Sequence, residues 1–147
     1  DAHFKNWADD YLFIKHRNET RGIGGIFFDR LASQKAKEKE QIWQFVLSIG
    51  NEFLPIYTEL ISRNRDRPYN KAQQDWQYLR RGRYVEFNLI LDKGTKFGLD
   101  TDGRTESILM SLPPFASWEY NHQPKKESPE AKTLAYLVKD IDWVNND

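Results

Sequence analysis

The sequence predicts an α+β fold in which an antiparallel β-sheet is flanked by helices. From Tyr84 to Asp92, apolar side chains alternate with mostly polar ones, which is the period-two pattern of a strand with one buried face. Other segments are rich in Lys, Glu and Ala and carry apolar residues three or four positions apart, as amphipathic helices do. With 147 residues, 39% of them hydrophobic, the chain fits one domain with its own core.

The N-terminal part of the chain predicts one helix and one strand. In residues 1–11 aromatic side chains recur three or four positions apart, which is typical of one face of a helix. Residues 23–28 are apolar and interrupted by glycine. We expect them to form a buried strand that ends at Asp29.

The middle of the chain predicts three helices. Residues 33–48 begin with a candidate serine N-cap and carry an apolar stripe at helical spacing. A second helix follows Gly50, in spite of Pro55. A third helix begins after the Pro-Tyr-Asn sequence at 68–70, and we expect it to end near Arg81.

The strands of the sheet are expected directly after the third helix. Two strands, 83–92 and 95–99, would be joined by a tight hairpin turn. Residues 107–112 fit either a strand or a short helix, because short apolar runs are ambiguous. Ser128 followed by Pro129 predicts an N-cap and the first position of a last helix.

Charge and cysteine content exclude several classes of function. The 22 basic and 22 acidic residues balance, so the chain lacks the overall positive field that binds nucleic acid or an anionic membrane. The sequence has no cysteine, which excludes disulfides, zinc fingers and cysteine-bound iron–sulfur clusters. No apolar run reaches the length of a membrane span, and the N-terminus lacks a signal-peptide pattern. We therefore expect a soluble, cytoplasmic protein.

Arginines and glycines gather near the ends of the predicted strands. Arginine binds carboxylates bidentately, and the glycines at positions 94, 98 and 103 would let the backbone approach a ligand closely. These residues predict a small anionic partner. The Gly-Ile-Gly-Gly sequence at 22–25 leads into an apolar stretch instead of a helix, so it does not predict a nucleotide site.

The three histidines, at positions 3, 16 and 122, do not have the spacing of a compact metal motif. A lone histidine is more often structural than a ligand. We expect no metal site, and His16 is the only candidate ligand.

Several motifs of the sequence resemble those of one enzyme family. They are HRNETRGIGGIFFD at 16–29, RRGRYVEFN at 80–88, GTKFGL at 94–99, GRTESILMSLPP at 103–114 and WEY at 118–120. In this order they resemble the C-terminal half of oxygen-dependent coproporphyrinogen III oxidase. Family members are longer, so residues 1–147 are expected to be a C-terminal portion of the oxidase domain, without its N-terminal half. The resemblance implies that the sheet is half of an α/β/α sandwich.

This resemblance also implies an activity. The family uses O2 to decarboxylate two propionates of coproporphyrinogen III to vinyl groups, which gives protoporphyrinogen IX in haem biosynthesis. The alternative is a catalytically inactive tetrapyrrole-binding or dimerisation fragment of that enzyme. The resemblance implies that no metal or organic cofactor is needed. It also implies a homodimer, formed through the region from Tyr84 to Tyr120. It makes the mitochondrial intermembrane space a second candidate location beside the cytoplasm.

Five residues match family positions that are implied to act on the substrate. Arg21 would lie near the substrate and Asp92 would border the active cleft, both in catalytic roles. Asp102, Gly103 and Arg104 would contact the substrate, although the family pattern is closer to Gly-Gly-Arg and the carboxylate of Asp102 is unfavourable beside a propionate. The alternatives are a salt bridge within the fold for Arg21 and a turn cap for Asp92.

Overall fold

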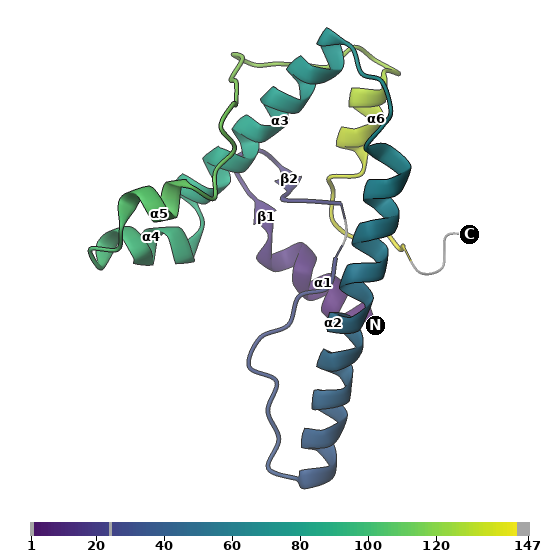
Figure 1. The fold of residues 1–147 in the computed structure, drawn as a ribbon, viewed down its shortest axis with the longest axis vertical. Helices are drawn as coiled ribbons and strands as arrows, with labels where there is room; N and C mark the ends of the chain where they lie inside the picture. Colours follow the sequence, from purple (N-terminus) through teal and green to yellow (C-terminus); the bar gives the residue numbers. More distant parts are fainter. Residues whose placement is uncertain (1, 24, 144–147) are drawn as a thin grey trace. The chain divides into compact units, whose positions relative to one another are not determined.

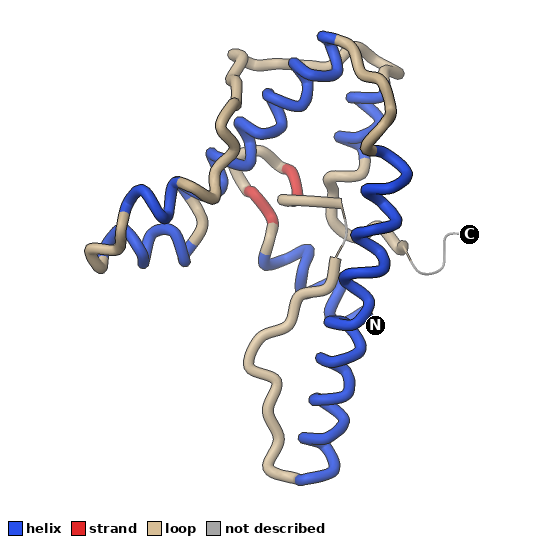
Figure 2. Tube along the Cα trace, viewed as in Figure 1, coloured by secondary structure: helices blue, strands red, loops and turns tan. Residues whose placement is uncertain are grey.

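The computed structural model describes residues 2–23 and 25–143, which form six helices and one two-stranded antiparallel sheet (Figure 1). The elements are α1 (Ala2–Tyr11), β1 (Phe13–Ile14), β2 (Glu19–Thr20), α2 (Ala36–Asn64), α3 (Lys71–Ile90), α4 (Lys93–Asp100), α5 (Thr105–Leu109) and α6 (Pro129–Ala135). The α+β class predicted from the sequence is confirmed, with helix predominating (Figure 2). The position of the sheet in the sequence is not the predicted one.

The chain divides into two compact units. The α2 unit consists of residues 28–69, and the main unit consists of residues 1–27 and 70–147. Along the described residues, no helix combines the length and the apolar character that crossing a membrane would require.

The main unit begins with α1 and the β1–β2 hairpin, in which Phe13 pairs with Thr20 and Ile14 pairs with Glu19. The Thr20 N–H donates to the Leu137 carbonyl at 2.9 Å, so the C-terminal segment lies against the hairpin. The buried apolar side chains all belong to this unit. They are Ala8, Ile14, Leu79, Val85, Phe87 and Leu137.

The strand predicted at residues 23–28 is wrong for the described residues of that segment; residue 24 lies outside them. Phe27 explains the difference, because its ring stacks on Tyr11 at 4.2 Å between centroids and meets Trp7 edge-on at 5.5 Å. Its N–H donates to the Phe4 carbonyl at 3.3 Å. The apolar segment therefore packs on α1 instead of joining the sheet.

Helix α3 begins at the predicted place. Asn70 and Gln73 form a capping box, in which each side-chain oxygen accepts from the other residue's backbone N–H at 2.9 Å. The helix does not end near Arg81 but continues to Ile90, so the predicted strand at 83–92 is wrong.

Burial along α3 explains its length. Leu79, Gly82, Val85 and Asn88 are buried at intervals of three residues, so the buried positions shift by about 60° at each step and follow a strip that winds around the helix. Asn88, which looked solvent-facing in a strand, donates its side-chain N–H to the Tyr84 carbonyl at 2.8 Å. The sequence does alternate between apolar and polar residues here, but in the helix this alternation does not correspond to which side chains are buried.

The predicted second strand, 95–99, is also wrong, because these residues belong to α4. The Asp92 carboxylate accepts the Thr95 N–H at 2.8 Å and so acts as the N-cap of α4 instead of closing a hairpin. Helices α4 and α5 pack side by side, and α5 resolves the ambiguity at 107–112 in favour of a short helix (Figure 1). Ser128 caps α6 as predicted, since its hydroxyl accepts the Ala131 N–H at 3.2 Å.

In the α2 unit, the two helices predicted on either side of Gly50 form one helix of 29 residues. Pro55 lacks an N–H and therefore leaves one carbonyl without its helical partner, but the helix continues through it. Ser33 is not the N-cap, because the helix starts at Ala36 with Lys35 in the cap position. No residue of α2 is buried.

Candidate functional site

The turn between β1 and β2 is attached to α3 by a cluster of charged side chains. Arg17 donates from Nε and Nη2 to the two oxygens of Glu86 at 2.8 and 2.7 Å. His16 Nε2 lies 2.6 Å from Glu86 Oε1, and Arg83 Nη1 lies 3.4 Å from Oε2. The hydrogen bonds from Arg17, helped by His16 and Arg83, lower the pKa of Glu86 to about 2, although partial burial opposes its ionisation.

His16, the only candidate metal ligand from the sequence, is part of this cluster. Its Nε2 atom faces the Glu86 carboxylate. Within residues 2–23 and 25–143, no three His, Asp or Glu side chains are grouped so that they could hold a metal ion. His16 therefore has a structural partner in Glu86.

Arg21 lies at the C-terminal half of α3. Its guanidinium carbon is 4.6 Å from the ring centroid of Phe87, which is a cation–π distance. Phe87 is buried, and its carbonyl accepts the Asp92 N–H at 3.0 Å. Arg21 and Asp92, the two predicted catalytic residues, therefore both contact Phe87 of α3, Arg21 through its side chain and Asp92 through its backbone N–H.

Asp92 uses one carboxylate oxygen, Oδ2, to cap α4. Its side chain is half-buried at the junction of α3 and α4. Lys93, the next residue, places its ammonium 5.9 Å from the ring centroid of Tyr11. The helix-capping alternative for Asp92 is thus realised, and Oδ1 remains available to a ligand.

The predicted substrate-contacting residues form the turn between α4 and α5. Asp102 has a positive φ of 57°, and the Gly103 N–H donates to the Gly98 carbonyl at 2.8 Å. A Cβ atom at Gly103 would lie 2.5 Å from that carbonyl oxygen, so the close turn requires glycine. Arg104 is exposed, and among the described residues its guanidinium has no carboxylate partner.

A hollow of about 460 Å³ borders the Glu86 cluster. Its polar rim is formed by His16, Arg17 and Glu86, and its apolar wall includes Val85 and Trp118. The Arg17 and His16 side chains of this rim are already bonded to the Glu86 carboxylate, so the hollow combines a paired polar rim with an apolar wall.

Comparison with known proteins identifies the family of this chain. The profile of the coproporphyrinogen III oxidase family matches residues 2–143. The chain belongs to the coproporphyrinogen III oxidase family. It is 54% identical over 142 residues to the oxygen-dependent coproporphyrinogen-III oxidase of Drosophila melanogaster. That match covers 96% of this chain and 36% of the relative, so the chain spans about a third of the length of the curated relative that it matches.

Membership of the coproporphyrinogen oxidase family confirms the resemblance inferred from the sequence motifs. What sequence reasoning missed is the pairing of Arg17 with Glu86, which are 69 residues apart. In the predicted strand, Glu86 would lie on the solvent-exposed face and would need no partner. In a helix, Arg83 and Glu86 are neighbours three residues apart, and this spacing is the signal that could have indicated a charged cluster on α3.

Proposed function

We propose that this chain acts in the oxygen-dependent oxidative decarboxylation of coproporphyrinogen III. In each of two propionates a C–H bond and the bond to the carboxyl carbon break, and the side chain becomes a vinyl group. Of the two electron pairs released, one forms the C=C bond of the vinyl group. The other, with the hydrogen from the C–H bond and a proton, reduces O2 to hydrogen peroxide while CO2 leaves, so each decarboxylation consumes one O2. The observation that carries this proposal is the match to the oxidase family over nearly the whole chain.

The exposed arginines support a role in binding the substrate. Coproporphyrinogen III carries four propionates, and a guanidinium without an internal carboxylate partner can bind a propionate bidentately. Arg104 fits this role at the α4–α5 turn, where Gly103 allows the close backbone contact with Gly98. This role requires the Asp102 carboxylate to face away from the bound propionate. Arg21, over the Phe87 ring, would stabilise negative charge near the reacting propionate.

Asp92 is the proposed catalytic carboxylate of this chain. Its free oxygen could accept a pyrrole N–H and so favour electron release from the reduced macrocycle. Because Asp92 also caps α4, Asp92→Ala would remove both roles, whereas Asp92→Ser keeps a capping oxygen and removes only the carboxylate. We expect Asp92→Ser to fold normally and to lose most turnover. Full turnover in the serine variant would assign Asp92 to capping alone.

A homodimer through the region from Tyr84 to Tyr120 is part of this proposal. The region exposes many large apolar side chains, which is typical of an interface. Met110 is 82% exposed and Tyr120 is 99% exposed. Sedimentation of the chain over a range of concentrations tests this assembly, and a monomer at all concentrations would contradict it.

The second candidate function is an inactive tetrapyrrole-binding or dimerisation portion of the oxidase. It rests on the same family match, which covers 36% of the Drosophila enzyme. Turnover of coproporphyrinogen III, followed by porphyrin fluorescence after oxidation of the product, separates the two candidates. We further propose that no metal or organic cofactor takes part and that the protein works in the cytoplasm, with the mitochondrial intermembrane space as the alternative.

A further inference from the structure

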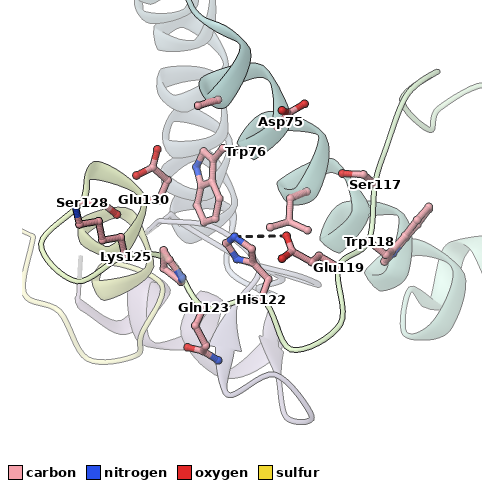
Figure 3. A pocket seen from close by; sticks show the side chains of 13 residues that line it. Asp75, Trp76, Ser117, Trp118, Glu119, His122, Gln123, Lys125, Ser128 and Glu130 are labelled. Atoms are coloured by element: carbon pink, nitrogen blue, oxygen red, sulfur yellow. Dashed lines mark ion pairs between the residues drawn. The ribbon is translucent and has the colours of Figure 1, made fainter.

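The main unit has a second, larger pocket of about 570 Å³, which shares Trp118 with the hollow beside the Glu86 cluster (Figure 3). The N-terminal half of α3 forms one side of it, residues 117–125 form another, and the start of α6 closes it. None of the five predicted substrate residues lines this pocket.

The wall of the pocket is aromatic and aliphatic. The rings of Trp76 and His122 lie 5.8 Å apart between centroids, tilted by 41°, and Figure 3 shows them facing each other. Leu79, which is buried, lies beside them on α3. An alkyl chain that packs against Trp76 and Leu79 would bury apolar surface that is otherwise in contact with water, which favours binding.

The charged lining has the carboxylates of Asp75, Glu119 and Glu130 and one ammonium, that of Lys125. Asp75 is paired with Lys71 outside the lining, so the carboxylates available to a ligand are those of Glu119 and Glu130. Glu119 is 67% exposed and reaches only His122, at 3.8 Å. Among the described residues, Glu130 has no side-chain hydrogen bond or ion pair. The lining therefore attracts cations and repels a substrate that carries four propionates.

We propose that this pocket binds an organic cation, an ammonium or guanidinium group on an aliphatic stem. The stem would lie on Trp76 and Leu79, and the charged group would lie between Glu119 and Glu130. The chain itself shows that this indole accepts a guanidinium, since Cζ of Arg80 lies 5.8 Å from the Trp76 ring centroid. The same chemistry is carried by a free polyamine and by an arginine or lysine side chain of a peptide.

Calorimetric titration of the 147-residue chain with agmatine, without any porphyrinogen, tests this site. We expect saturable binding that butanol, which has the stem alone, and Mg²⁺, which has the charge alone, do not reproduce. Titrations with spermidine and with a blocked arginine tripeptide then identify the source, and binding of either one supports the proposal. Failure of agmatine, spermidine and the tripeptide to bind overturns it.

Variants of the lining give the second arm of the test. Glu119→Gln/Glu130→Gln should weaken agmatine binding about tenfold or more, because both carboxylates line the pocket in which the cation is proposed to bind. Glu127→Gln is the control, since it removes one carboxylate charge from the loop before α6, outside the pocket, and should leave the affinity within about twofold.

Lys125→Gln removes the only ammonium of the lining and should tighten binding. It keeps the proposal falsifiable if the double variant fails to fold. Unchanged affinity in the double variant, equal losses in the Glu127 control, or weaker binding by the Lys125 variant would each contradict the proposed site.

Discussion

The Glu86 cluster should be a major contributor to the stability of the main unit. The pKa of Glu86 falls from its ordinary value of 4.5 to about 2 in the folded chain. That difference of about 2.5 pKa units corresponds to about 3.4 kcal/mol of preference for the ionised, folded form. Glu86 is only 11% exposed, but Arg17 is 36% exposed, so solvent screening reduces the expected contribution to about 2 kcal/mol.

Glu86→Gln should therefore lower the free energy of unfolding by about 2 kcal/mol at neutral pH, because Arg17 loses its bidentate carboxylate. Since the folded pKa lies below the unfolded one, this stabilisation is present above pH 4.5 and is lost as the pH falls from 4.5 toward about 2. Urea unfolding at a series of pH values measures the difference between wild type and variant, which should shrink across that window. Glu127→Gln serves as the exposed control.

Two results would refute this reasoning about Glu86. Equal stability of wild type and Glu86→Gln at pH 7 would show that the bidentate contact contributes nothing. A constant difference down to the lowest pH would show that the variant acts through packing instead of charge.

Three further predictions concern packing, binding and metal dependence. Gly82→Ala should lower the free energy of unfolding by about 2 kcal/mol, because the new Cβ would lie 2.2 Å from the Ser117 carbonyl oxygen. Without that contact, alanine would raise the free energy of unfolding by about 1 kcal/mol through its helix propensity, so a stabilised variant in urea unfolding would contradict the predicted clash. Arg104→Ala should weaken coproporphyrinogen binding by about 1–3 kcal/mol and Arg104→Lys should recover only part of it, as measured by anaerobic titration. Any turnover should survive exhaustive chelation, and its loss with recovery on adding one metal would make His16 a ligand after all.

Elements whose signals are local could be predicted from the sequence. The start of α3 depends on Asn70 and Gln73, and the start of α6 depends on Ser128 and Pro129, so neighbouring residues determine both. The first helix was predicted from aromatic spacing within a single segment and is observed as Ala2–Tyr11.

The second half of α3 could not be predicted in this way. Two of the residues that its buried face uses are Gly82 and Asn88, which carry no hydrophobic signal. Gly82 is required because the Ser117 backbone crosses the helix there, a contact between residues far apart in the sequence. The apolar alternation that suggested a strand includes Leu89, which is 42% exposed in the helix.

The candidate site was predicted mainly from the motifs that resemble the oxidase family. Those motifs indicated Arg21, Asp92 and Arg104, whose roles in binding and catalysis stay predictions. The backbone contact of Asp92 with Phe87 is local to the end of α3, whereas the contact of Arg21 with Phe87 depends on the docking of the β1–β2 hairpin on α3, which no local pattern reports. The same is true of the pairing between Arg80 and Glu19, at 3.0 Å, which strengthens that docking.

The central claim, that this chain binds the propionates of coproporphyrinogen III through Arg104, is tested most directly by comparing the substrate with its tetramethyl ester. Anaerobic titration of wild type and Arg104→Ala with both compounds makes a double comparison in which only the carboxylate and the guanidinium change. We expect wild type to bind the acid more tightly than the ester, and Arg104→Ala to lose much of that preference. Equal affinity of wild type for acid and ester would contradict the claim.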